Sequence, residues 1–259
     1  IESLAQRPNR VETFKTIIQR ELPAFMQRAD PFGWRDLFDR FADWQFMVFS
    51  KGKPLGAALT LPLSWSGAPQ ELPGSFEEVL IRAVGSRELG KPFNTLVSLV
   101  VGLSERAAAS DSRGLVLNAL VRLAHERGVT HLLAPVRPAQ KCHHPLAPLD
   151  QYINWKQVDG SPFDDDLRLH WKAGATMIGT MTRAVTLEET VNVWEQWAQM
   201  PFTDSGEYIV AGALNPVLID QESNRGWYEE ACVWMLHTPL NQTNPPLLSE
   251  ATQTACIVM

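Results

Sequence analysis

The alternation of apolar and polar positions predicts a strand, a helix and a second strand in the middle of the chain. An apolar run over 96–101 is followed by a short polar loop around Gly114 and by a helix over 115–127 with a broad apolar face. Gly128 ends this helix, and the apolar run 132–136 predicts the next strand. A strand, a glycine-containing turn and a helix N-terminus bring backbone N–H groups and the positive helix end to one point. The pattern therefore predicts an anion site, suited to a pyrophosphate such as that of coenzyme A.

The flanking segments complete a mixed α/β pattern. Residues 11–28 are predicted to be helical with an interruption at Pro23, and the runs 45–50 and 55–65 flank a turn at 51–53, which predicts an antiparallel hairpin. Further predicted elements are helices at 34–42 and 164–173, a short helix or irregular segment at 76–84, and a strand at 176–185. A helix at 187–199 with Thr186 as its N-cap and a closing strand pair at 208–220 and 227–237 follow. This order predicts one mixed α/β domain around a single sheet.

We divide the chain into three parts. Residues 1–43 form an N-terminal helical segment, residues 44–237 form the main domain, and residues 238–259 form a polar tail rich in Pro, Asn, Thr and Ser. A tail of this composition is expected to pack poorly. The last four residues, Cys256 to Met259, also fit a prenylation signal, but no basic cluster precedes them, so a prenyl anchor at Cys256 is the less favoured alternative.

Charge and cysteine content exclude several classes of function. The formal net charge is −6 and Lys and Arg are scattered, which argues against a nucleic-acid groove. The three cysteines are odd in number and far apart, which favours a reduced, cytoplasmic compartment over a disulfide framework. We find no apolar run long enough to span a bilayer. Cys142, His143 and His144 lack a fourth partner at a fixed spacing, so no metal site is predicted.

Two motifs resemble those of the GNAT (N-acetyltransferase) superfamily of acyltransferases. The first mark of that family is a loop of the form Arg/Gln-x-x-Gly-x-Gly/Ala between a strand and a helix. Residues 112–120 match its central glycine with Gly114, whereas Ser112 and Val116 replace its other small residues. The resemblance implies a central mixed, mostly antiparallel sheet flanked by helices.

The second mark is a helix that ends Tyr-x-x-x-Gly-Phe before a strand. Residues 167–175 fit this frame with Gly174 in register, and His170 stands at the tyrosine position. The resemblance covers roughly residues 44–185. The segments 135–155 and beyond Val185 resemble the GNAT-like subgroup that includes the loading domains of polyketide synthases.

The resemblance implies which residues hold the coenzyme. Backbone N–H groups around Gly114 would bind the pyrophosphate, with a charge-assisted contact from the side chain of Arg113. The preceding strand would lend backbone groups to the pantetheine arm, as an added strand would. The implied coenzyme-binding residues are Val101, Leu103, Arg113, Gly114, Leu115 and Val116.

Two side chains are candidates for catalysis. His170 would take the role of the family tyrosine, which protonates the leaving thiolate, and a pKa near 6.5 suits imidazole for proton transfer at neutral pH. The alternative is an ordinary core histidine. Arg137 follows the strand 132–136, where the two central strands of this family separate, and it could bind a carboxylate or an acyl carbonyl. The alternative for Arg137 is a surface salt bridge, and Arg183 could face the same cleft from the next strand.

The resemblance implies transfer of an acyl group from a coenzyme A or carrier-protein thioester to an amine by direct attack. The strand 99–103 would polarise the carbonyl through its N–H groups. The implied partners are a small-molecule amine or a carrier protein, with no nucleic acid and no transmembrane segment. Two alternatives remain open. One is decarboxylation of a malonyl thioester and loading of a carrier protein, with Arg137 on the carboxylate and His170 protonating the enolate; the other is a non-catalytic acyl-CoA-binding module.

Overall fold

The computed structural model describes residues 1–29, 31, 34–108 and 112–237. The strands pair in the order β1-β2-β3-β4-β5-β9-β8-β7, with β6 paired to β9 on the side of that path. Only β4 and β5 run parallel among the described pairs, and all others are antiparallel. The strand bounds are β1 Glu2–Ser3, β2 Phe46–Ser50, β3 Lys53–Leu63, β4 Thr95–Leu103, β5 His131–Val136, β6 Thr176–Glu189, β7 Gly206–Tyr208, β8 Val217–Asp220 and β9 Arg225–His237. The predicted mixed, mostly antiparallel α/β fold is confirmed.

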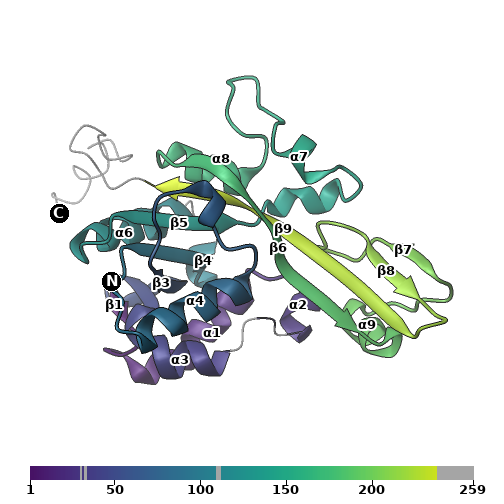
Figure 1. Cartoon of the computed structure of the whole chain (residues 1–259), viewed down its shortest axis with the longest axis horizontal. Helices are drawn as coiled ribbons and strands as arrows, with labels where there is room; N and C mark the ends of the chain where they lie inside the picture. Colours follow the sequence, from purple (N-terminus) through teal and green to yellow (C-terminus); the bar gives the residue numbers. More distant parts are fainter. Residues whose placement is uncertain (30, 32–33, 109–111, 238–259) are drawn as a thin grey trace, which may run out of the picture.

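Helices cover both faces of the first five strands (Figure 1). Helices α1 and α4 pack on β3 from one face, whereas α6 contacts β3, β4 and β5 from the other. Beyond this body, the long strands β6 and β9 continue together and carry β8, β7 and α9 at their far end (Figure 1). The helix bounds are α1 Val11–Gln19, α2 Ala24–Ala29, α3 Trp34–Phe41, α4 Phe76–Glu88, α5 Glu105–Ala108, α6 Arg113–Glu126, α7 Leu149–Tyr152, α8 Asp165–Lys172 and α9 Val191–Ala198.

Local turn chemistry explains several element ends that the sequence predicts. The β2–β3 hairpin turns at Lys51 and Gly52, which both have positive φ (50° and 74°), as a two-residue hairpin turn requires. Asp164 caps α8 by accepting the N–H groups of Asp166 and Leu167. Gly174 follows α8 with φ of 83°, so the predicted helix stop is confirmed.

The helix predicted at 187–199 is shorter than expected. Leu187, Glu188 and Glu189 belong to β6, where they pair with Tyr228, Trp227 and Gly226 of β9. The N-cap position is therefore Thr190, and the prediction of Thr186 is wrong. The apolar pattern of 187–189 suits a strand as well as a helix, and the long partner strand decides between them.

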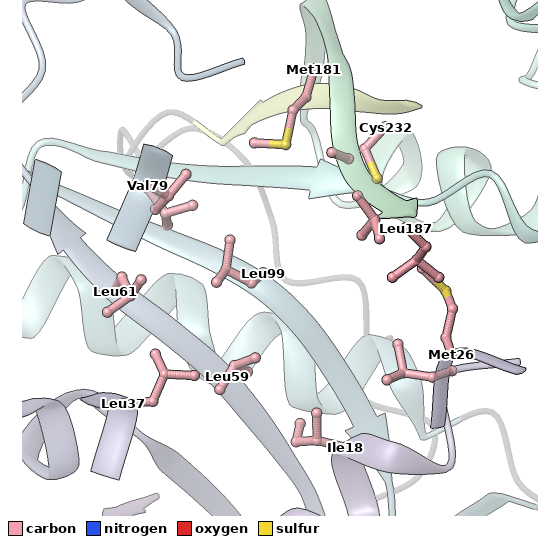
Figure 2. Packing of buried hydrophobic residues seen from close by; sticks show 14 of the residues in the cluster. Ile18, Met26, Leu37, Leu59, Leu61, Val79, Leu99, Met181, Leu187 and Cys232 are labelled. Carbon is pink, nitrogen blue, oxygen red and sulfur yellow. The ribbon is translucent and has the colours of Figure 1, made fainter. Parts of the chain in front are cut away.

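The first helical segment shares its core with the sheet. Figure 2 shows Ile18, Met26 and Leu37, from α1, α2 and α3, around the same interior as Leu59 and Leu99. All five side chains are buried, and burying such a group contributes about 1.5–3 kcal/mol each. The predicted tail 238–259, including Cys256, lies outside the described residues.

Strands β4 and β5 separate near their midpoints. They pair at only three positions, of which the last is Val97 with Leu133. Beyond this point β4 continues beside β3 to Leu103, and β5 continues beside β9 to Val136. The two parallel strands therefore open a gap in the middle of the sheet.

A β-bulge on β4 lies directly after this point. Thr60 of β3 faces Ser98 and Leu59 faces Val100, so Leu99 is an extra residue on β4. Leu99 and Val100 both pack on the main core, which breaks the strict alternation of the strand. The bulge leaves the backbone of Leu99 outside the β3 ladder, at the edge of the gap.

Candidate functional site

A cavity of about 630 Å³ occupies the gap between β4 and β5. Its walls come from β4 and β5, from α6 and α8, and from α2 and the segment that joins α1 to α2. The lining residues are Glu21, Leu22, Met26, Phe76, Ser98, Leu99, Val100, Val101, Leu103, Ala108, Arg113, Leu117, Ala134, Pro135, Val136, Arg137, Ala139, Gln140, Asp165, Asp166, Leu169, His170 and Glu230. A concave, largely apolar space with a few converging polar groups is typical of a small-molecule site.

The cavity brings together five of the residues predicted from the sequence. Val101, Leu103, Arg113, Arg137 and His170 all line it, although they come from three different elements and one loop. The separation of the central strands, which the resemblance implied, explains why residues so far apart in the sequence meet here. Gly114, Leu115 and Val116 do not line it.

The amides at the start of α6 differ from the prediction. The N–H groups of Leu115 and Val116 donate to the carbonyl oxygen of Ser112, at 3.1 and 3.2 Å. These two groups are therefore already satisfied, and their predicted role as free anion donors is wrong for this conformation. Among the described residues, the N–H groups of Arg113 and Gly114 have no backbone acceptor.

The side chain of Arg113 is held by two carboxylates. Its Nη2 lies 2.7 Å from Oε2 of Glu21, and its Nη1 lies 3.0 Å from Oδ1 of Asp166. Glu21 also accepts the N–H of Leu103 at 3.1 Å. Arg113 therefore links the segment that follows α1 to α8 across one end of the cavity, and an anionic ligand would compete with both carboxylates for it.

His170 is buried and paired with a second histidine. It is 8% exposed, and its Nδ1 lies 2.9 Å from Nε2 of His237 at the end of β9. Burial lowers the pKa of His170 to about 3, with smaller contributions from His237 and Arg113, and burial lowers the pKa of His237 to about 4. Both rings are neutral at neutral pH. The expected pKa of His170 near 6.5 is wrong, because burial of the imidazole lowers it. The sequence alone does not show that this side chain is buried.

The hydrogen bond between the rings fixes which nitrogen of His170 can face a ligand. Nδ1 of His237 is buried without a partner among the described residues. An unprotonated ring nitrogen costs less free energy to bury without a partner than a ring N–H group does, since buried N–H groups without an acceptor are rare. We therefore assign the proton between the rings to Nε2 of His237. His170 then accepts at Nδ1 and carries its own proton on Nε2.

Arg137 takes part in a buried ion pair rather than a surface salt bridge. Its Nε lies 2.9 Å from Oε1 of Glu230, and its Nη2 donates to the carbonyl oxygen of Gly212 at 2.6 Å. Glu230 is 1% exposed and also accepts the hydroxyl of Tyr228 at 2.7 Å. Burial opposes the charge of Arg137, but the charge of Glu230 outweighs it and the pKa of Arg137 is raised.

The structure adds polar residues that the sequence analysis did not single out. Ser98 is 3% exposed and lines the cavity, and its Oγ has no hydrogen-bond partner among the described residues. Glu230 and Glu21 supply the carboxylates described above. The sequence carried a signal for Ser98, because it is a polar residue within an otherwise apolar run.

Other predicted positions lie elsewhere. Arg183 is 72% exposed at its side chain, pairs with Glu229 at 3.2 Å, and lines a separate cavity, so its predicted place in the central cleft is wrong. His144 packs against Tyr152, Trp155 and Phe163. Within the described part of the chain, no group of three His, Cys, Asp or Glu residues could hold a metal ion. The helices described there include none long and apolar enough to cross a membrane.

Comparisons with known proteins agree with this architecture. No family model matches the chain. The GphF GNAT-like decarboxylase, solved in complex with isobutyryl-CoA, superposes with a TM-score of 0.56 over 90% of this chain and 97% of that structure, at 16% identity. The loading GNATL domain of CurA from Lyngbya majuscula superposes with a TM-score of 0.52 over 89% and 93% of the two chains, at 12% identity. The sheet with its opened central strand pair is thus a GNAT-type fold.

The predicted resemblance to the GNAT superfamily is confirmed by these similarities. A curated relative is the arginine N-acetyltransferase avaD of Aspergillus versicolor, which is 28% identical over 185 residues. That match covers 63% of this chain and 63% of the relative, so the chain spans less than two thirds of the curated protein that it matches.

Proposed function

We propose that this protein transfers an acyl group from a coenzyme A thioester to an amine by direct attack. The observation that carries the proposal is the cavity between β4 and β5, which gathers Arg113, Arg137 and His170 around one strand edge. The name of the curated relative, an N-acetyltransferase, supports the same reaction class.

The carrier would lie along the free edge of β4. Beyond Val97 this strand has no β5 partner, so the backbone groups of Val101 and the carbonyl oxygen of Leu103 are available to an extended pantetheine arm, whereas the N–H of Leu103 donates to Glu21. At the far end the arm would reach Arg113 and Gly114 at the start of α6. A Cβ on Gly114 would meet only Leu169 Cδ1, at 3.8 Å, so helix packing alone does not require a glycine there. Close approach of the coenzyme to the backbone at this position would explain why it is a glycine.

The thioester carbonyl would lie at the β-bulge. The N–H of Leu99 stands outside the β3 ladder and can donate to the carbonyl oxygen as negative charge develops. The hydroxyl of Ser98, which lacks a protein partner among the described residues, can donate to the same oxygen or to the adjacent amide of the carrier. Positioning the thioester against these donors would supply much of the rate.

The amine nitrogen would attack the carbonyl carbon, the new C–N bond would form and the C–S bond would break. The amine proton would leave to solvent in the open part of the cavity. His170 would donate a hydrogen bond from its protonated Nε2 to the departing sulfur, as a neutral imidazole can. This role replaces proton transfer by an imidazolium, since the pKa of His170 is about 3.

Mass spectrometry with arginine and a panel of other amines tests the proposal. The protein is incubated with acetyl-CoA, isobutyryl-CoA or malonyl-CoA, and the products are weighed. Acylated amine with free coenzyme A supports the transferase. Loss of carbon dioxide from malonyl-CoA without an amine product would support the decarboxylase, for which Arg137 could hold the carboxylate. Binding without turnover of any thioester would support a binding module.

Replacement of His170 by Ala is expected to lower turnover about 100-fold, as loss of one donor to a developing anion commonly does. The dissociation constant for acetyl-CoA is expected to stay within about twofold, because the coenzyme is held elsewhere. Steady-state kinetics and calorimetric titration measure the two quantities. His125→Gln, an exposed histidine of α6, is the matched control and should keep normal turnover. Normal turnover in the His170 variant would remove this residue from the mechanism.

Replacement of Ser98 by Ala is expected to lower kcat/KM about fivefold, with the loss of one hydrogen bond to substrate. Stability is expected to stay equal or to rise slightly, because the variant removes a buried hydroxyl that has no partner in the described structure. Thermal unfolding and kinetics on the same sample separate these effects. A variant that loses stability but keeps its activity would assign Ser98 a purely structural role.

A further inference from the structure

A second cavity, of about 330 Å³, lies beside the tip of the β2–β3 hairpin. Its rim carries three cationic side chains, those of Lys51, Lys53 and Arg106, and Ser104 contributes to its wall. The remaining lining residues are Ser50, Pro54, Leu55 and Ala107. This concentration of positive charge stands out on a chain whose net charge is −6.

The three cations have no counter-ion in the described structure. Lys51, Lys53 and Arg106 form no ion pair with a described carboxylate, whereas Arg113 and Arg137 of the main cavity are both paired. Three unpaired like charges around one hollow repel one another. An anionic ligand would remove this repulsion and gain three charge-assisted contacts.

Two further features mark the hollow as a binding site. The Oγ of Ser104 is buried and has no hydrogen-bond partner among the described residues, which leaves a donor for an oxygen ligand. Lys51 has φ of 50°, in the left-handed region that Asn, Asp and Gly adopt most readily. A lysine there costs some backbone strain, and such strain is often found at functional positions.

The position of the hollow indicates where the anion comes from. Leu103 and Ala108 line the main cavity, whereas Ser104 and Ala107 line the hollow, so the two spaces flank the short helix α5. From Leu99 at the bulge to the end of β4 at Leu103 the strand extends over about 13 Å, at about 3.3 Å per residue. A coenzyme A molecule with its thioester at the bulge carries its phosphates at the opposite end. We propose that this hollow binds a phosphate of the nucleotide end of the coenzyme, an inference that rests on the proposed function.

The phosphate monoester on the ribose is the group that the test addresses. Dissociation constants are measured for acetyl-CoA and for acetyl-3′-dephospho-CoA, with the wild-type protein and with the Lys53→Gln/Arg106→Gln variant. Wild-type protein is expected to prefer acetyl-CoA about tenfold, the effect of charged hydrogen bonds to one group. In the double variant the preference is expected to fall close to one. Lys51→Asn, which suits the left-handed turn, is expected to reduce it about threefold.

Lys91→Gln is the matched control, since Lys91 is exposed and lies just before β4, at the strand end remote from the hollow. This variant should keep the full preference. A wild-type protein with equal affinity for the two ligands, or a double variant with undiminished preference, would overturn the assignment of the hollow while the proposed function stands. No measurable affinity of the wild-type protein for acetyl-CoA would overturn the proposed function, and this inference with it.

Discussion

Replacement of Glu230 by Gln is expected to lower the free energy of unfolding by about 3–5 kcal/mol, because it leaves a charge without its partner in the protein interior. Glu230 is 1% exposed and accepts from both Arg137 and Tyr228. The side-chain amide of the variant has an N–H₂ group where the carboxylate has an oxygen, so it would face one of these two donors with a donor of its own. Arg137 would keep its positive charge without a negative partner, and the carbonyl oxygen of Gly212 would still accept from it. Urea denaturation of the variant and the wild-type protein measures the difference.

A surface pair supplies the matched control. Glu12 pairs with Lys15 within α1, and its side chain is largely exposed. Glu12→Gln is expected to change stability by less than about 0.5 kcal/mol. The double replacement Glu230→Leu/Arg137→Met is expected to recover much of the loss, since it removes both charges and keeps the volume. A Glu230→Gln variant as stable as wild type would show that the buried pair contributes nothing to the fold.

Local chemistry made much of the fold predictable. Gly128 and Gly174 end their helices with φ of 71° and 83°, and each was recognisable from its place after an apolar periodic segment. The hairpin turn at Lys51 and Gly52 follows from two alternating runs around it. These features depend on a few neighbouring residues, which the sequence shows directly.

Two local structures could not be predicted from the sequence pattern and depend on contacts in the folded chain. Residues 187–189 have a pattern that suits helix and strand, and pairing with β9, about 40 residues later, makes them a strand. At the start of α6 the sequence predicts free amides, but the tight first turn directs those of Leu115 and Val116 to Ser112. No sequence pattern distinguishes these two geometries.

The sequence predicted several of the residues that line the site, but not their protonation states. The motif frame led to His170 and the end of β5 led to Arg137, and both line the cavity. Their partners lie far away in the sequence, His237 at 67 residues and Glu230 at 93. Protonation states depend on these partners and on burial, which only the assembled fold supplies. In this fold His170 is a neutral hydrogen-bond donor, whereas the sequence predicted an imidazole that titrates near neutral pH.

The paired histidines are expected to make stability strongly dependent on pH. In the unfolded chain each imidazole titrates near 6.5, so below that pH the unfolded state binds protons that the native pair does not. Stability is therefore greatest above pH 6.5, falls as the pH decreases, and stops falling on this account only below the native pKa values of about 3 and about 4. Between pH 7.5 and 5.0 the two rings together account for a loss of about 4 kcal/mol, or about 2 kcal/mol each.

Denaturation at pH 7.5 and at pH 5.0 measures this loss, and variants isolate the share of the histidines from that of the carboxylates. In the His170→Gln/His237→Gln variant the difference between the two pH values should shrink by about 4 kcal/mol, and in His237→Gln alone by about 2 kcal/mol. His125→Gln, on the exposed side of α6, should leave it unchanged. A double variant with the same pH dependence as wild type would mean that the two rings are solvated or charged in the native protein. His170 would then be a titrating acid, and the neutral-donor mechanism would be lost with it.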